Sequence, residues 1–230
     1  MRVLLIGFFC IFSQTLFGQF GIIADKDGFV NVRKSPNVSS TIIDTLTNGQ
    51  IVYCFEAEGE WFPTDYDFSG QSKSGYIHNS RLKFIGNFDK ITSNNLTDST
   101  ISFKKDSIKL FITRTSFNPK NNKLQYHKVD NSNNEMTYLE KINGKKIWGT
   151  DGRVPEKQYG QITLTLGKHR INLPIDNLFE PDIDYTTVNI DTKNRTIYIS
   201  ALNGDGAGGY VVLWIIENGK FKERIITLGF

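Results

Sequence analysis

Short runs of apolar and β-branched residues alternate with turn residues along almost the whole chain. Val30 and Val32 are separated by Asn31, and this period of two places both valines on one face of a strand. Glycine and asparagine recur roughly every 8–12 residues, a spacing at which turns separate short strands. No long window has the 3.6-residue apolar period of a surface helix. The pattern predicts an all-β protein.

The end of the chain has the clearest strand pattern. Four successive strand candidates cover residues 186–190, 196–202, 210–217 and 220–228. The third candidate is apolar at both alternating sets of positions, so we expect a central strand that is covered on both faces. Asn218-Gly219, before the fourth, is typical of a two-residue hairpin turn. These features predict a larger antiparallel β domain, built as a sandwich or as a layered sheet.

The first residues of the chain have the pattern of a secretion signal. Met1-Arg2 is followed by an apolar run over residues 3–12 and by a polar stretch that ends in Gly18. We expect residues 1–18 to be a signal peptide. The apolar run is shorter than the roughly 20 residues that a membrane-spanning helix needs. We therefore expect an exported protein, periplasmic or extracellular, with no transmembrane segment after signal cleavage.

Composition narrows the possible partners and the compartment. The chain is 39% hydrophobic and 22% charged, which is ordinary globular composition. A formal net charge of +3 is too small for the phosphate neutralisation on which nucleic-acid binding depends, so we expect no nucleic-acid partner. Removal of the leader would leave Cys54 as the only cysteine, which excludes an intramolecular disulfide. Its β-forming neighbours predict a small buried side chain.

A polar stretch divides the chain. Residues 87–100 are rich in asparagine, serine, threonine and aspartate, and strand patterns lie on both sides of them. We expect a linker there, between a small domain over residues 20–86 and a β-rich domain over residues 101–230. The small domain is near the lower size limit for a core that folds by itself.

Four motifs in the small domain resemble one family. Val30-Asn31-Val32-Arg33 is similar to an opening motif of leucine, asparagine, valine and arginine, and residues 46–52 are similar to a turn and strand motif with a central glycine. Trp61 stands where a tryptophan is expected, and residues 75–82 match a closing motif that begins with glycine and an aromatic residue. On these motifs, residues 22–86 resemble the bacterial SH3-like domain. The resemblance implies a small β-barrel of the kind attached to many cell-wall enzymes and envelope proteins. The rest of the chain resembles no family that we recognise.

Aromatic residues gather in the second half of this small domain, and such residues bind peptides or sugars on small barrels. Asn31 and Arg33 alternate with Val30 and Val32, so they are expected on the outer face of their strand. We therefore expect a ligand-binding groove on the SH3-like domain, formed by Asn31, Arg33, Trp61, Tyr66 and Tyr76. The alternative for each aromatic residue is a place in the barrel core.

We also tested the chain for catalytic and cofactor motifs. Residues 204–209 match a G-x-G-x-x-G pattern, but a strand rather than a helix follows, so we expect no dinucleotide site. His78, His127 and His169 lie in no motif that positions a nucleophile or a metal. Cysteine peptidases with SH3-like modules need a cysteine in the domain that would follow here, and none follows Cys54. We expect no enzymatic activity, no cofactor and no metal.

Two non-catalytic functions remain open, beside a third hypothesis of an enzyme of unknown class in the C-terminal domain. The first is a secreted, non-catalytic envelope protein whose SH3-like module binds cell-wall peptide, peptidoglycan or an envelope protein. The alternative is an immunity or inhibitor protein against a secreted toxin or a cell-wall hydrolase. For that alternative we expect the glycine-rich loop to contact the partner, through Asn203, Asp205 and Tyr210.

Overall fold

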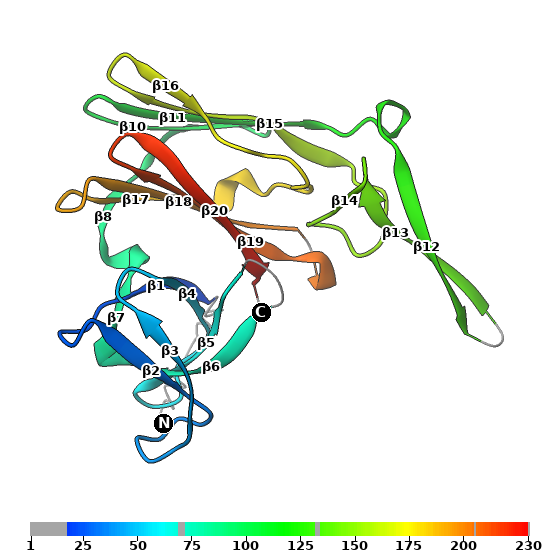
Figure 1. Ribbon diagram of the computed structural model, residues 1–230. Helices are drawn as coiled ribbons and strands as arrows, with labels where there is room; N and C mark the ends of the chain where they lie inside the picture. The colour runs from blue at the N-terminus through cyan, green and yellow to red at the C-terminus, as the bar shows by residue number, and fades with distance from the viewer. Residues whose placement is uncertain (1–17, 69–71, 132–133, 205, 230) are drawn as a thin grey trace, which may run out of the picture.

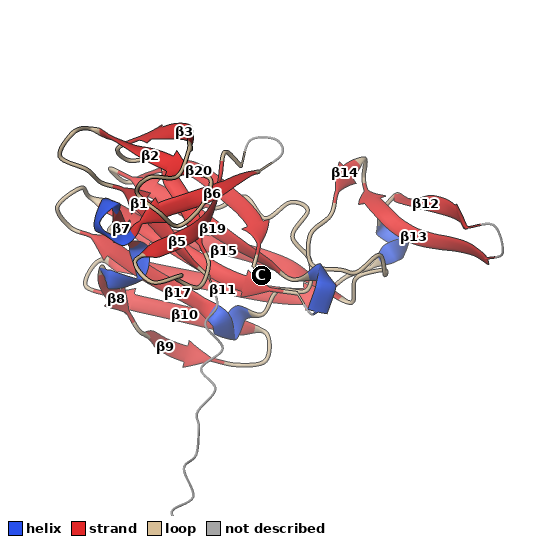
Figure 2. Ribbon diagram, turned by 90° about the horizontal axis from the view of Figure 1, so that it is seen from below, coloured by secondary structure: helices blue, strands red, loops and turns tan. Residues whose placement is uncertain are grey.

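The computed structural model describes residues 18–68, 72–131, 134–204 and 206–229. The predicted signal peptide lies outside these residues, apart from Gly18. The described part of the chain is built almost entirely of β-strands, joined by turns and short 3-10 helices (Figure 2). None of its helices is long and apolar enough to cross a membrane. The prediction of an all-β fold is confirmed.

Seven strands form the N-terminal barrel in the order β3-β2-β6-β5-β4-β1-β7. Their bounds are β1 Gln19–Ile23, β2 Phe29–Arg33, β3 Ile42–Thr47, β4 Ile51–Cys54, β5 Trp61–Tyr66, β6 Lys73–His78 and β7 Leu82–Phe84. Val30 and Val32 point into the barrel, as their alternation predicts, and Cys54 is fully buried there. Burial raises the pKa of the Cys54 thiol far above its usual range.

Two five-stranded antiparallel sheets pack face to face as a sandwich (Figure 1). One sheet has the order β16-β15-β11-β10-β9 and the other β20-β19-β18-β17-β8. The first contains β9 Ser93–Leu96, β10 Thr100–Lys105, β11 Ile108–Ser116, β15 Lys157–Leu166 and β16 His169–Asn172. The second contains β8 Asp89–Ile91, β17 Thr186–Asp191, β18 Thr196–Asn203, β19 Tyr210–Glu217 and β20 Lys220–Leu228. The four predicted C-terminal strands are confirmed, each within one residue of its expected end.

The segment expected to be a linker carries two of these strands. β8 pairs with β17 in one sheet, and β9 pairs with β10 in the other. The interpretation of residues 87–100 as a linker is therefore corrected. Only Ile91 of these two strands is buried. The pairing rests on backbone hydrogen bonds at sheet edges, which polar residues supply as well as apolar ones.

A β-hairpin arm projects from the sandwich (Figure 2). It is formed by β12 Leu124–Asn131, β13 Asn134–Ile142 and the short β14 Lys145–Lys146. Asn143-Gly144 makes the turn between β13 and β14, with both residues at positive φ, as a two-residue hairpin requires. Leu139 and Ile142 pack with Phe117 and Phe179 in a separate small core at the base of the arm.

The barrel packs directly on the outer face of the β20-β19-β18-β17-β8 sheet. Phe20, Tyr53 and Ile85 of the barrel segment share a hydrophobic cluster with residues of β18, β19 and β20. The Tyr53 hydroxyl also donates a hydrogen bond to the backbone carbonyl of Gly229, at 3.3 Å. The molecule therefore has three layers: barrel, sheet and sheet.

This arrangement explains why β19 is apolar over residues 210–216. Trp214 and its alternate neighbours face the core of the sandwich, whereas Leu213 and its alternate neighbours face the barrel. Both Trp214 and Leu213 are 0% exposed. The prediction of a central strand covered on both faces is confirmed.

Candidate ligand-binding groove

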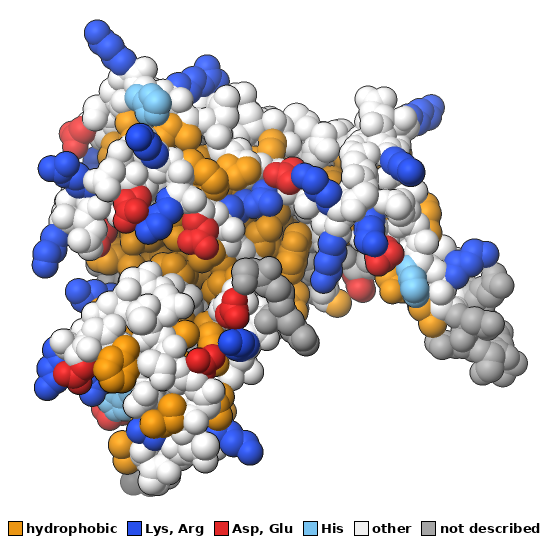
Figure 3. Space-filling view, viewed as in Figure 1, with side chains coloured by type: hydrophobic (Ala, Val, Ile, Leu, Met, Phe, Trp, Pro, Cys, Tyr) orange, Lys and Arg blue, Asp and Glu red, His pale blue; other side chains and the backbone are white. Residues whose placement is uncertain are grey.

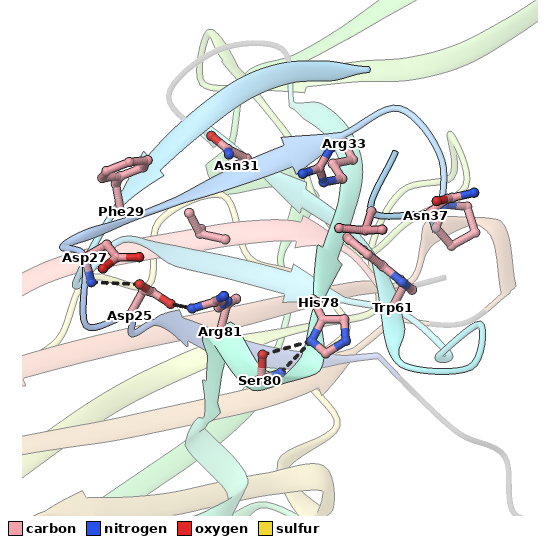
Figure 4. Close-up of a pocket in the computed structure, with 13 residues that line it drawn as sticks. Asp25, Asp27, Phe29, Asn31, Arg33, Asn37, Trp61, His78, Ser80 and Arg81 are labelled. Carbon is pink, nitrogen blue, oxygen red and sulfur yellow. Dashed lines mark hydrogen bonds and ion pairs between the residues drawn. The ribbon is translucent and has the colours of Figure 1, made fainter. Parts of the chain in front are cut away.

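A groove of about 590 Å³ lies on the barrel beside β2 (Figure 4). Because Val30 and Val32 point inward, the alternate residues Phe29, Asn31 and Arg33 point outward and form one wall. The other walls come from the turns that precede and follow β2, from Trp61 on β5, and from the end of β6 with the 3-10 helix Asn79–Arg81. We call this surface the β2 groove.

Trp61 and His78 stand together at one end of the β2 groove. They are register partners on β5 and β6, and their rings pack edge to face with centroids 5.1 Å apart. The backbone N–H of Ser80 donates to His78 Nδ1, which caps the 3-10 helix. Nδ1 therefore lacks a proton in the neutral ring, and Nε2 carries the hydrogen that faces Glu60 Oε2, at 3.2 Å. These contacts fix the imidazole as a support for the indole.

Two arginines of the groove are held differently. Arg81 forms an ion pair with Asp25, whose side chain is only 3% exposed. Arg33 donates from one guanidinium nitrogen to the backbone carbonyl of Ser40, at 2.7 Å. The Ser40 carbonyl is neutral, so Arg33 keeps its charge and its remaining donors for a ligand.

Three of the five predicted groove residues line this surface, namely Asn31, Arg33 and Trp61. Tyr76 lies instead at a separate shallow pocket with Ile43 and Phe55, and its hydroxyl donates to Glu58 at 3.0 Å. That hydrogen bond to a carboxylate raises the pKa of the Tyr76 phenol. Whether any of these residues binds a ligand stays a prediction.

The expected position of Tyr66 is corrected, because its side chain is 3% exposed and belongs to the barrel core. Burial and the nearby Asp44 carboxylate raise the pKa of Tyr66 to about 12. Strand parity explains the position: Tyr66 is five residues from Trp61 on β5, and an odd separation puts two side chains on opposite faces. The sequence contained this signal.

The other lining residues of the β2 groove were missing from the prediction, among them Phe29, His78 and Arg81. Phe29 is two residues before Asn31 on β2, so the alternation of the strand places both side chains on the outer face, and Phe29 is 47% exposed there. The sequence therefore predicts its place on the wall of the groove. His78 and Arg81 reach the groove through the pairing of β6 with β5 and through the 3-10 helix that follows. No local pattern specifies that pairing.

The predicted partner-contact loop is also corrected. Asn203 and Tyr210 are both 0% exposed. Asn203 Oδ1 accepts hydrogen bonds from the Tyr159 hydroxyl, at 2.9 Å, and from the backbone N–H of Asp182, at 3.0 Å. The Tyr210 hydroxyl donates to the Phe179 carbonyl, at 3.1 Å. These two residues hold the fold together, and Asp205 lies outside the described residues.

The glycine-rich segment joins two antiparallel strands, β18 and β19, through the 3-10 helix Gly206–Gly208. It packs against the loop at residues 149–151, where a Cβ on Gly208 would lie 2.7 Å from the Thr150 carbonyl carbon. No α-helix follows it, so the segment lacks the helix N-terminus of a dinucleotide site. Among the described residues, no group of three or more His, Cys, Asp or Glu side chains lies close enough to hold a metal ion.

Comparison with known families confirms the resemblance seen in the motifs. Residues 28–83 match the family model of the bacterial SH3 domain, and this range contains β2 to β6 and most of β7. The chain therefore contains a bacterial SH3 domain, to which β1 adds a strand from outside the matched range. Neither the curated proteins nor the solved structures include a match to this chain.

Proposed function

We propose that this is an exported, non-catalytic cell-envelope protein whose SH3 domain binds cell-wall peptide in the β2 groove. The observation that carries the proposal is the position of the groove. The barrel packs on the sandwich through β1, β4 and the segment around Ile85, whereas β2 lies on the far side of the barrel (Figure 1). The groove is thus open to a large ligand while the barrel is fixed to its neighbour.

The composition of the groove supports binding rather than bond cleavage. Phe29 and Trp61 supply apolar surface, and Asn31 supplies an amide between them. His78 is the one histidine in the groove, and both of its ring nitrogens have partners on the barrel. Aromatic surface with a few fixed polar groups is the usual makeup of a recognition site. The leader sequence supports export.

A protein partner, as in an immunity or inhibitor protein, is the second candidate, and the arm favours it. Tyr126 and Met136 on the arm are 50% and 64% exposed. Basic and acidic side chains both lie on the visible face of the arm (Figure 3). Exposed apolar side chains on a projecting hairpin are suited to contact with another protein surface.

Co-sedimentation of the purified protein with peptidoglycan, across a series of salt concentrations, tests the first candidate. We expect pelleting that persists at high salt and that falls at least about tenfold in Trp61→Ala. Tyr185→Ala is the matched control, since Tyr185 is 57% exposed but lies on the sandwich. No pelleting, or equal pelleting of wild type and Trp61→Ala, would reject the β2 groove as a wall-binding site and favour a protein partner.

A further inference from the structure

The β2 groove has an unpaired charge at each end. Among the described residues, Asp27 has no cationic partner: its backbone N–H donates to Asp25 Oδ1, and its own carboxylate makes no hydrogen bond or ion pair. Arg33, at the other end, has no carboxylate partner in the described part of the chain and donates there only to the Ser40 carbonyl. Figure 4 shows Asp27 beside Phe29 at one end and Arg33 beside Trp61 at the other.

The middle of the groove is neutral. Arg81 and Asp25, which lie next to Asp27 in Figure 4, compensate each other. Asn31 stands between Phe29 and Arg33 on β2, and its side-chain oxygen is 3.5 Å from the Thr45 hydroxyl. Its amide nitrogen therefore stays available to donate to a ligand carbonyl.

The length of the groove follows from strand geometry. Phe29 and Arg33 are four residues apart on β2, which corresponds to about 13 Å at 3.3 Å per residue. An extended peptide of about four residues covers the same distance. Its backbone carbonyls would pass Asn31, and its side chains would contact the two aromatic rings.

We propose that the β2 groove binds a short extended peptide in one direction, with the peptide's amino group at Asp27 and its carboxylate at Arg33. This inference rests on the proposed function, because it specifies the ligand chemistry of the same groove. Charges at both ends make the groove selective for dipolar segments, since a ligand in reverse would bring like charges together. Arg33 suits the carboxylate because its planar guanidinium can donate two parallel hydrogen bonds.

Isothermal titration calorimetry with tetra-alanine tests the inference, using the free peptide, its N-acetylated form and its C-amidated form. For the wild-type protein, we expect each cap to weaken binding about fivefold to tenfold, the effect of losing one partly exposed charged contact. In Asp27→Asn the N-acetyl cap should have no further effect. In Arg33→Gln the amide cap should have no further effect.

Two variants keep the test specific. Lys34→Gln removes a neighbouring charge that does not line the β2 groove, and it should respond to the caps as the wild type does. Arg33→Lys keeps the charge without the planar fork, so it should retain part of the preference for a free carboxylate. A thermal melt of each variant shows whether it is folded.

Three results would each overturn the inference. The caps could have no effect on binding to the wild type, the effects of the caps could persist in Asp27→Asn and Arg33→Gln, or free tetra-alanine could fail to bind. These outcomes are separate from the proposed function. If peptidoglycan pellets the protein through Trp61 but the caps have no effect, wall binding stands. Only the inferred orientation of the peptide by its terminal charges is then rejected. Failure of the peptidoglycan assay would reject the proposed function itself.

Discussion

The indole of Trp61 rests edge-on against the imidazole of His78, with an angle of 86° between the ring planes. Both residues are on the outer face of the barrel, and the contact joins two paired strands, β5 and β6. His78 is itself held by Ser80 and Glu60. The aromatic end of the β2 groove is therefore ordered without a ligand, so binding does not have to supply the free energy of ordering it.

Trp61 and Tyr66 lie on the same strand and should respond differently to truncation. Trp61→Ala should lower the free energy of unfolding by about 1 kcal/mol, the value of an aromatic pair. Tyr66→Ala should cost about 3–5 kcal/mol, because it empties a buried site in the barrel core. Urea unfolding followed by circular dichroism measures both. Equal losses would place Trp61 in the core and remove it from the groove.

The shared cluster between barrel and sandwich predicts a single unfolding transition. Leu213 is fully buried on the barrel side of β19, so Leu213→Ala should destabilise both layers together, by about 2–5 kcal/mol. Differential scanning calorimetry of the wild type should give one peak, and the variant one peak at lower temperature. Two separate peaks in the wild type would mean that the barrel and the sandwich unfold independently.

Two glycines test whether the glycine-rich loop is packed. A Cβ on Gly208 would lie 2.7–3.0 Å from backbone atoms of Thr150 and Asp151, whereas a Cβ on Gly86 would meet nothing within 4 Å. Gly208→Ala should cost about 1–3 kcal/mol of stability through overpacking. Gly86→Ala should be neutral or stabilising by up to about 1 kcal/mol. Thermal melts of the two variants check this, and a neutral Gly208→Ala would mean that the loop is free to move away.

Asp176 predicts a dependence of stability on pH. Its carboxylate contacts Lys145 at the base of the arm, at 2.7 Å, and Arg224 on β20, at 3.4 Å. The hydrogen bond from Lys145 and the charge of Arg224 lower the pKa of Asp176. A lowered pKa in the folded state contributes stability above about pH 4, the unfolded value, and the contribution is lost as the pH falls through the folded value.

Asp176→Asn should therefore be less stable than the wild type at pH 7, and the two should converge in acid. The effect should be modest, because the Asp176 side chain is 49% exposed and water screens its ion pairs. Urea unfolding at pH 7, 5 and 3 measures the difference. A difference that grew as the pH fell would contradict the assignment of the shift to these cations.

The sequence predicts the strands well because alternation records which face of a strand is buried. β19 is the best case, since a short apolar run that is rich in β-branched and aromatic residues and lies between turn residues predicts a strand with cover on both sides. Its outer cover could not be predicted, because the barrel supplies it and nothing in residues 20–86 identifies a docking face. In the arm, the sequence predicts the hairpin on Asn143-Gly144 but not the pairing of β12 with β13, because most residues of these two strands pack on no large core. β8 and β9 escaped because their pairing needs backbone groups rather than apolar side chains.

Groove residues could be predicted where the alternation along one strand places them on the outer face. They were missed where the pairing of two strands brings them to the groove. Asn31 and Arg33 follow from the alternation of β2, and the same rule, applied to β5, places Tyr66 inside. Asn203 shows the limit of local composition. A polar residue beside glycines suggests a surface loop, but here the glycines allow two backbones to approach, and the amide of Asn203 satisfies groups buried between them.

The contact between Tyr53 and Gly229 joins a strand near the start of the chain to its last described residue. A ribosome makes the barrel first, and β19 and β20 emerge last. Until then, the wall of the barrel that carries Phe20 and Tyr53 faces water without its cover. During synthesis, the barrel therefore exposes an apolar surface that is prone to self-association until β19 and β20 cover it. A chain that ended before β20 would keep part of this apolar surface exposed to water.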